Sequence, residues 1–229
     1  GGATILQPCT GKPETKGWYN GTAHAVYKNI NFIRQSNPDH VIILSGDHVY
    51  KMDYSKLINF HQEKNAKLTI AAKAVDYQEA HRFGILDHDP QMKITDFVEK
   101  PDKAPSNLAS MGIYVFETET LLNYLSKYCT KKSSDFGNHI IPRVIEQEDT
   151  FAYQFDGYWR DVGTIKSFWK SNLELLKPLP KLNLHNEDWK LFTRSREKQP
   201  VIFGNSGKAS SSLVSNVVII DGHVENSII

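Results

Sequence analysis

Apolar residues recur at helical and strand spacing along the first half of the chain. In residues 22–36 they lie three or four positions apart, and Asn37-Pro38 ends the pattern, so a helix is predicted. The run HVIILS follows at residues 40–45. Its consecutive aliphatic side chains predict a strand that is covered on both faces, which is typical of a parallel sheet.

A second helical pattern, at residues 54–64, leads into the strand-like run KLTIAAKAV at residues 67–75. Strand, helix and strand in this order predict a crossover unit of an open α/β sheet. The pattern continues, with strands predicted at FGILD, KITDFVEK and SMGIYVF and helices at residues 117–127, 137–147 and 164–176. An α/β domain is therefore predicted over residues 1–176.

The chain changes character after residue 176. Prolines and alternating polar residues predict an extended linker over residues 177–200. In residues 201–229, short β-branched runs recur at roughly six-residue spacing, which is typical of a hexapeptide β-helix. These residues supply little more than one coil, and a repeat of this kind needs several stacked coils. We therefore expect the β-helix domain to be truncated at residue 229.

Charge and composition narrow the class of protein. The 229 residues include 27 Lys and Arg against 26 Asp and Glu, a formal net charge of +1. Nucleic acids and anionic membranes need a basic surface, so neither is expected as the principal partner. No run approaches the ~20 apolar residues of a membrane span, and residues 1–10 lack the features of a secretory signal. Cys9 and Cys129 are too few for a disulfide framework or a zinc site, so both are predicted to be reduced thiols in a cytoplasmic protein.

Two aspartates stand at predicted strand ends. Asp47 follows the aliphatic run of residues 40–45, and Asp161 lies between an aromatic stretch and a predicted helix start. Open α/β sheets bind ligands outside the carboxyl ends of their strands, and two carboxylates there can share one divalent cation and, with it, a polyphosphate. The alternative for either residue is a capping or turn aspartate.

A Glu-Lys pair ends another predicted strand. Pro101 turns the chain out of the sheet directly after Lys100. A lysine fixed there offers a compact positive charge to a phosphate group, and Glu99 can accept hydrogen bonds from hydroxyls. The alternative is a solvated ion pair at a turn. Gly84 either allows the backbone to approach a bound ligand closely or marks a bulge. Ser110 either contacts the ligand or is a strand-end hydroxyl without a role.

Three apparent motifs fail on inspection. The triplet DFG at residues 135–137 lacks the glycine-rich loop and the catalytic loop of a kinase. The run GNSGKAS at residues 204–210 lacks the first glycine and the hydroxyl residue of a phosphate-binding loop. The nine histidines include no HExxH pair, so His48 receives no role.

Seven ordered blocks together resemble the glucose-1-phosphate adenylyltransferases, also called ADP-glucose pyrophosphorylases. They cover most of residues 17–164 and read GWYNGTAHAV, LSGDHVYKMDY, RFGIL, FVEKP, LASMGIYVF, SSDFGNHIIP and GYWRDVGT. GDH or FVEKP alone would indicate only a sugar nucleotidyltransferase, whereas the whole set is similar to the adenylyl branch.

The resemblance implies a fold and a reaction. The fold would be a Rossmann-like, GT-A-like α/β nucleotidyltransferase with an open, mostly parallel sheet, followed by the start of a left-handed parallel β-helix. The reaction would convert ATP and α-D-glucose 1-phosphate into ADP-glucose and pyrophosphate for glycogen or starch synthesis, with Mg²⁺ as cofactor. A homo- or hetero-tetramer in the cytoplasm, or in the plastid of a plant, would be the setting.

The resemblance also implies roles for individual residues. Asp47 and Asp161 match the family's magnesium-binding aspartates, and Lys100 matches the lysine that binds the sugar phosphate. These three would be the catalytic residues. Substrate-binding residues are matched by Tyr19, Gly21, Thr22, Gly84, Glu99 and Ser110.

One departure from the family concerns the ATP site. In the family, a glycine-rich, basic loop holds the triphosphate of ATP, and no such loop precedes residues 1–10 of this sequence. We therefore expect little or no turnover from this chain alone. Three alternatives stay open: a uridylyl- or thymidylyltransferase of the same superfamily, a non-catalytic regulatory subunit, and a hexapeptide acyltransferase. Because regulatory subunits typically lose the aspartates or the lysine that are present here, a catalytic-type subunit is favoured.

Overall fold

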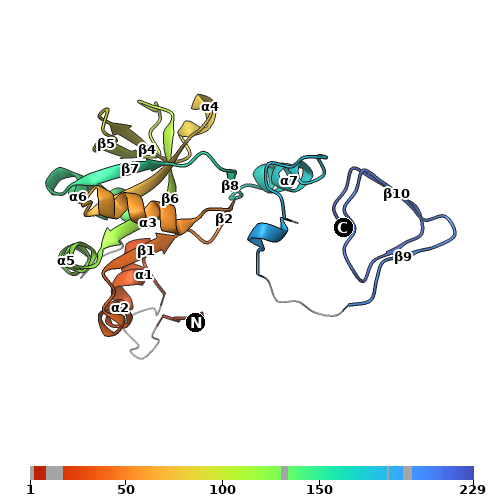
Figure 1. Ribbon diagram of the computed structural model, residues 1–229, viewed down its shortest axis with the longest axis horizontal. Coiled ribbons are helices and arrows are strands. Elements are labelled where there is room, and N and C mark those ends of the chain that lie inside the picture. Colours follow the sequence, from red (N-terminus) through yellow and green to blue (C-terminus); the bar gives the residue numbers. More distant parts are fainter. Residues whose placement is uncertain (1–2, 9–17, 130–133, 185, 193–197) are drawn as a thin grey trace. The chain divides into compact units, whose positions relative to one another are not determined.

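The computed structural model describes residues 3–8, 18–129, 134–184, 186–192 and 198–229 (Figure 1). The chain forms two compact units. The first, which we call the sheet unit, comprises Gly1–Ser45 and Asp53–Asp156. The second unit comprises Gly46–Met52 and Gly157–Ile229. The domain boundaries expected from the sequence at residues 176 and 200 stay a prediction.

The sheet unit contains a six-stranded sheet whose main path runs β5-β4-β6-β3-β7, with β1 paired to β6 as well. The strands are β1 (His40–Leu44), β3 (Leu68–Ala74), β4 (Gly84–His88), β5 (Ile94–Glu99), β6 (Leu108–Glu117) and β7 (Thr150–Gln154). All except β7 were predicted from the sequence. Together with the helices they confirm an α/β architecture.

The strand directions correct the expectation of a mostly parallel sheet. Only β3 and β7 pair in parallel among the strands of this sheet, and the other pairings are antiparallel. The predicted crossover exists, since β1 and β3 both run opposite to β6 and therefore share a direction. However, β6 lies between them and pairs with both. Aliphatic runs identify central strands without fixing which strand inserts between them.

Strand β1 is also less covered than its aliphatic run predicts. Its residues are only partly buried, and Leu44 is 45% exposed. The prediction that β1 is buried on both faces was therefore wrong. Among the described residues β1 also pairs with β6 alone, so no strand lies along its other edge there.

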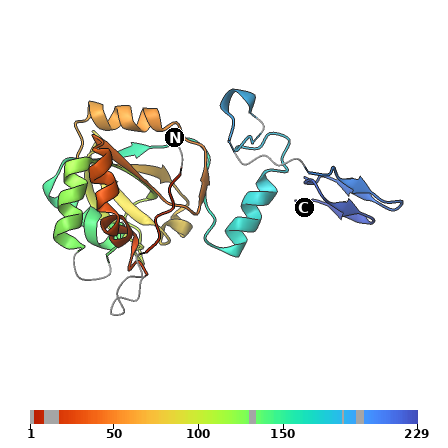
Figure 2. The ribbon, with the colours of Figure 1, turned by 90° about the horizontal axis from the view of Figure 1, so that it is seen from below.

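Helices cover both faces of the sheet (Figure 2). The predicted helix at residues 22–36 is split at Asn29, and the helix predicted at residues 137–147 begins with a π-helical turn, η1. The helices are α1 (Thr22–Lys28), α2 (Ile30–Ser36), α3 (Tyr54–Glu63), α4 (Tyr77–Ala80), α5 (Thr118–Tyr128), η1 (Phe136–Ile140) and α6 (Ile141–Gln147).

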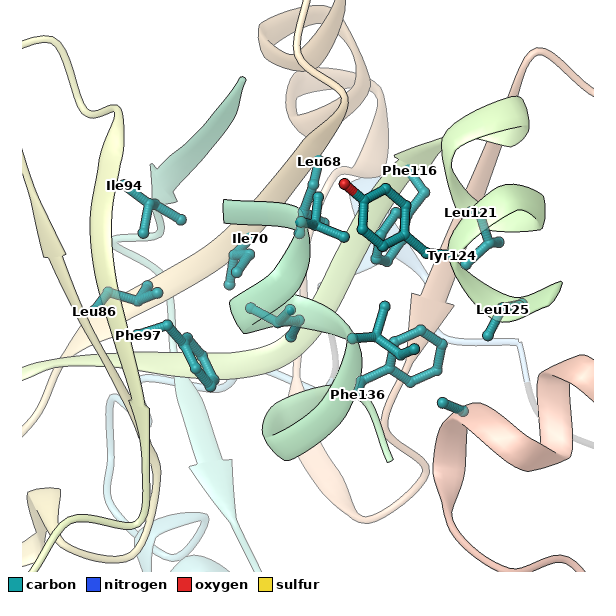
Figure 3. Packing of buried hydrophobic residues seen from close by; sticks show 14 of the residues in the cluster. Leu68, Ile70, Leu86, Ile94, Phe97, Phe116, Leu121, Tyr124, Leu125 and Phe136 are labelled. Atoms are coloured by element: carbon teal, nitrogen blue, oxygen red, sulfur yellow. The ribbon is translucent and has the colours of Figure 1, made fainter. Parts of the chain in front are cut away.

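Alternation along β3 separates the two faces. Leu68 and Ile70 join the main apolar cluster, which includes Phe116 of β6 and side chains of α5 and η1 (Figure 3). Thr69 points the other way and contacts His61 of α3. This is the period-two pattern of a strand with both faces covered. The cluster fixes η1 against the sheet, and η1 borders the candidate site described below.

The second unit has three parts. Strands β2 (His48–Tyr50) and β8 (Trp159–Asp161) pair antiparallel, and α7 (Ile165–Glu174) follows β8. A 3-10 turn, η2 (Glu187–Trp189), lies in the predicted linker. In the tail, β9 (Ile202–Phe203) pairs in parallel with β11 (Ile219–Ile220), and β10 (Lys208–Ser210) pairs in parallel with β12 (His223–Glu225). Parallel stacking of this kind is compatible with the start of a β-helix, which stays a prediction.

Cys129 is a buried free cysteine, whereas Cys9 lies outside the described residues. In the part of the chain that the structure describes, no helix has the length and apolar character needed to cross a membrane.

Candidate active site

Pairing of β2 with β8 brings Asp47 and Asp161 together although 113 positions separate them in the sequence. His48 lies directly opposite Asp161 in the register of this strand pair. The backbone N–H of Val162 donates to the carbonyl of Asp47 at 3.4 Å. The two aspartates that the sequence singled out therefore share one place in the second unit.

Local hydrogen bonds fix the position of Asp161 at the end of β8. Its Oδ1 accepts the backbone N–H of Gly163 at 2.7 Å, and its carbonyl accepts the hydroxyl of Ser167. A Cβ at position 163 would lie 2.9 Å from Asp161 Oδ1, so glycine allows this close turn. Thr164 caps α7 by accepting the N–H of Ser167 at 3.1 Å. The predicted corner between a strand and a helix is confirmed.

We call Asp47, His48 and Asp161 the carboxylate-histidine group. Each offers one ligand atom, and these atoms all lie within 4.8 Å of one another. His48 Nε2 is 3.6 Å from Asp47 Oδ1. Two carboxylates are the hard oxygen donors that Mg²⁺ prefers, and an imidazole nitrogen suits borderline divalent metals. The donor set present fits a divalent cation.

A second network ties β8 to α7 beside this group. Glu174 of α7 accepts hydrogen bonds from the Tyr158 hydroxyl, at 2.8 Å, and from the Arg160 guanidinium. Burial opposes ionisation of Glu174, but these two donors outweigh it and lower the pKa of its carboxyl group. Burial and the neighbouring Glu174 carboxylate raise the pKa of Tyr158 to about 12. An ionised Glu174 therefore holds Arg160, the residue next to Asp161.

In the sheet unit, β4 and β5 place Gly84 opposite Glu99. A Cβ on Gly84 would lie 2.9 Å from Glu99 Oε2, and a Cβ on Gly137 would lie 2.4 Å from the same atom. The Glu99 carboxylate thus occupies space that only glycine leaves open at both positions. Burial raises the pKa of Glu99, although the ammonium group of Lys100 opposes the shift. We call Gly84, Glu99, Lys100 and Gly137 the Glu99 corner.

Lys100 turns the chain at the end of β5. Its φ is +47°, in the left-handed region, and its N–H donates to the carbonyl of Phe83 at 3.0 Å. The side chain is 67% exposed, with Nζ 4.0 Å from Glu99 Oε1. The ammonium group is therefore available to an anion while the backbone below it is fixed.

Ser110 and Tyr114 of β6 belong to the same surroundings. The N–H of Gly112 donates to Ser110 Oγ at 3.2 Å, and Ser110 is 7% exposed. Burial raises the pKa of Tyr114 to about 12, and the carboxylates of Glu99 and Asp135 act in the same direction. Asp135 precedes η1 and accepts the N–H of Asn138 at 2.8 Å.

The start of α1 packs against the residues that enter η1. Gly21 has φ +106°, and a Cβ there would lie 2.3 Å from the carbonyl oxygen of Ser134. Thr22 Oγ1 accepts the N–H of Phe136 at 3.1 Å. The Tyr19 hydroxyl donates to the carbonyl of Leu6 at 3.0 Å and accepts from Asn29 Nδ2 at 2.9 Å. Gly21 and Thr22 thus support the fold around η1, whereas Tyr19 links residues near the N-terminus to Asn29. Contact of these three residues with substrate stays a prediction.

The structure thus groups the candidate residues in two units. Asp47 and Asp161 come together in the second unit, and Gly84, Glu99 and Lys100 come together in the sheet unit. Sequence reasoning left out four residues that these groups contain or border, His48, Tyr114, Asp135 and Gly137. Asp135 and Gly137 carried a signal in the DFG triplet, which was rejected as a kinase motif and counted within the block SSDFGNHIIP, but neither residue was assigned a role. His48 and Tyr114 lay in the blocks LSGDHVYKMDY and LASMGIYVF but received no role, because their surroundings arise from strand pairing and packing.

Comparison with known proteins identifies the class. A family model described as nucleotidyl transferase matches residues 4–178, and the chain belongs to this family. The match confirms the predicted nucleotidyltransferase fold.

Within this family, the chain is similar to several curated proteins that share one name. The chain is 48% identical to a protein named glucose-1-phosphate adenylyltransferase from Thermosipho africanus, over 100% of this chain and 56% of the relative. It is 47% identical to a protein of the same name from Fervidobacterium nodosum, over 98% of this chain and 54% of the relative. The relative from Pseudothermotoga lettingae is 48% identical over 100% of this chain and 55% of its own length. The chain spans about half the length of the curated relatives it matches.

Proposed function

We propose that this chain carries residues for adenylyl transfer from ATP to α-D-glucose 1-phosphate, giving ADP-glucose and pyrophosphate. The observation that supports it most is the convergence of Asp47 and Asp161, with His48, within 4.8 Å in a nucleotidyl transferase. The names of the relatives support the choice of adenylyl donor and sugar phosphate.

Asp47 and Asp161 would hold Mg²⁺ through their carboxylates. When bound, the ion would neutralise charge on the α-phosphate and on the departing pyrophosphate. The protein's own contribution would be to fix the Asp161 carboxylate through the N–H of Gly163 and the backbone of Asp47 through the N–H of Val162.

The Glu99 corner would bind the sugar phosphate. The exposed ammonium group of Lys100 offers a positive charge to the phosphate, and the Glu99 carboxylate and Ser110 hydroxyl offer hydrogen bonds to sugar hydroxyls. Tyr19, Gly21, Thr22 and Gly84 would contribute further substrate contacts. A phosphate dianion is already a nucleophile, so the proposal needs no general base, and catalysis rests on positioning and electrostatic stabilisation. From the family resemblance we also propose that the whole enzyme is a homo- or hetero-tetramer in the cytoplasm.

Pyrophosphorolysis tests the choice of nucleotide. The assay supplies pyrophosphate with ADP-glucose, UDP-glucose or dTDP-glucose and measures the nucleoside triphosphate and glucose 1-phosphate released. It is run on this chain and on a chimera that adds the flanking segments of the Thermosipho africanus relative. We expect the chimera to have its highest kcat/KM for ADP-glucose. A higher kcat/KM for UDP-glucose or dTDP-glucose would favour the other branch of the superfamily.

A further inference from the structure

His48 stands out in the carboxylate-histidine group because the proposed reaction leaves it without a task. Its ligand atom lies within 4.8 Å of those offered by Asp47 and Asp161. The distance from His48 Nε2 to Asp47 Oδ1 is 3.6 Å, which is longer than an ordinary N–H···O hydrogen bond. Two atoms that ligate the same ion can stand at such a separation without bonding to each other.

Strand pairing, a ring contact and burial together order the His48 ring. Pairing of β2 with β8 places it opposite Asp161. The ring packs edge-on against Trp159, with ring centroids 5.3 Å apart and planes at 85°. Its side chain is only 12% exposed, whereas that of Asp47 is 69% exposed. A ring already ordered in this way loses little further entropy when it binds an ion.

The donor chemistry then differs from that of two aspartates alone. Carboxylates favour hard ions such as Mg²⁺, whereas an added imidazole nitrogen favours first-row transition metals. Mn²⁺ accepts both kinds of donor and is less demanding of oxygen ligands than Mg²⁺. A site with two oxygens and one nitrogen should therefore gain affinity for Mn²⁺ and Co²⁺ over Mg²⁺.

We propose that His48 Nε2 is a third protein ligand of the divalent cation held by Asp47 and Asp161. The inference rests on the part of the proposed function that places a cation at these aspartates, and it is independent of the nucleotide and the sugar. It assigns this site a selectivity for ions that tolerate a nitrogen ligand.

The test uses Mn²⁺ alone as the probe of this chain, without nucleotide or sugar phosphate. Electron spin echo spectroscopy detects a nitrogen bound directly to Mn²⁺, and titration calorimetry gives the dissociation constants of Mn²⁺ and Mg²⁺. His48→Phe keeps a ring against Trp159 and removes the nitrogen, and His48→Gln serves as a second, polar replacement. His88→Gln, which changes an exposed histidine of the sheet unit, is the matched control.

We expect a nitrogen modulation with the unmodified chain and with His88→Gln, and its loss in both His48 variants. The Mn²⁺ dissociation constant should rise about tenfold or more in these variants, and that of Mg²⁺ by a smaller factor. Bound Mn²⁺ without nitrogen modulation, a modulation that survives both replacements, or no Mn²⁺ binding at all would overturn the assignment.

Asp161→Asn separates this assignment from the proposed function. If Asp161→Asn weakens Mn²⁺ binding while no nitrogen is detected, the ion site stands and the role of His48 fails. If the nitrogen is detected but the chimera does not release ATP from ADP-glucose, the ligand assignment stands and the adenylyl transfer proposal fails.

Discussion

Lys100 combines a fixed backbone with an exposed charge. Its φ of +47° is uncommon for a side chain with a Cβ, and its N–H is held by the carbonyl of Phe83. Such conformations persist where the surroundings determine them and are found often at ligand sites. The side chain is 67% exposed, so the fixed backbone carries a charge that solvent can reach.

Lys100→Ala should weaken binding of glucose 1-phosphate. A charged hydrogen bond to phosphate is worth about 1.5–3 kcal/mol, so the dissociation constant should rise by roughly 10- to 100-fold. Titration calorimetry with glucose 1-phosphate measures it. Lys103→Ala removes an exposed lysine three positions away and is the matched control. Equal effects of the two substitutions would refute the assigned role of Lys100.

Asp47→Asn should separate turnover from sugar-phosphate binding. The amide keeps the shape of the side chain and removes the charge that a cation needs. In the chimera we expect kcat to fall by about a hundredfold or more, while the half-saturating concentration of glucose 1-phosphate changes little. Steady-state kinetics give both values. A variant with an unchanged kcat would show that Asp47 does not hold the ion.

The residues that sequence reasoning found share one property. Asp47, Glu99, Lys100 and Asp161 stand at strand ends, where residue type and local pattern already suggest a ligand site. His48 lay beside Asp47 in the GDH run but received no role, because its contacts with Trp159 and Asp161 form only when β2 pairs with β8, and these strands are short and far apart in the sequence. The role that we propose for His48 depends on this tertiary pairing, which a local pattern does not reveal.

At the scale of elements, the sequence predicted strands and helices better than their pairing. β1, α3 and β3 were recognised, but the insertion of β6 between β1 and β3 was not, because a buried strand shows the same apolar run in either direction. β7 was missed because TFAYQ is short and alternates weakly. The π-helical turn η1 was read as ordinary helix, since the apolar period differs little over one turn.

The stability of the fold where α1 packs against η1 should depend on Gly21. An alanine there would meet strain at φ +106° and a Cβ 2.3 Å from the carbonyl oxygen of Ser134, a backbone atom that cannot move alone. We expect Gly21→Ala to lower the free energy of unfolding by about 2 kcal/mol or more. Urea denaturation measures this. Gly222→Ala, where a Cβ meets nothing within 4 Å, should change it little. Equal stabilities of the two variants would contradict the close packing at Gly21.

His61 should make the packing of α3 sensitive to acid. It is 1% exposed, it contacts Thr69 Oγ1 at 2.7 Å through Nδ1, and the described residues offer its buried Nε2 no hydrogen-bond partner. The pKa of His61 is lowered from 6.5 to about 4, and burial is the largest cause. The neighbouring His40 and Lys67 contribute to the lowering, whereas Glu117 opposes it.

The sign of the pH dependence follows from this lowered pKa. Between pH 6.5 and 4 the unfolded chain binds a proton at His61 that the folded chain does not. Stability from this group is therefore complete above pH 6.5 and falls, by at most about 3 kcal/mol, as the pH approaches 4. Urea denaturation at several pH values should show this slope, and His61→Gln should reduce it. If His88→Gln reduced the slope as much, His61 would not be its source.

At the scale of the whole molecule, the chain belongs to the nucleotidyl transferase family and spans 56% of the Thermosipho africanus relative. Its two units hold different parts of the proposed chemistry, the carboxylate-histidine group in the second unit and the Glu99 corner in the sheet unit. Because the formal net charge is only +1, the binding of small anionic substrates that we propose would depend on a few directed groups, Lys100 foremost.

The forward reaction tests the central claim most directly. The chimera is supplied with ATP, glucose 1-phosphate and Mg²⁺, and the products are followed by phosphorus NMR, with the Thermosipho africanus protein as the positive control. We predict that ADP-glucose and pyrophosphate appear in equal amounts as glucose 1-phosphate is consumed. Hydrolysis of ATP to ADP and phosphate, or unchanged glucose 1-phosphate where the control consumes it, would contradict adenylyl transfer by this chain.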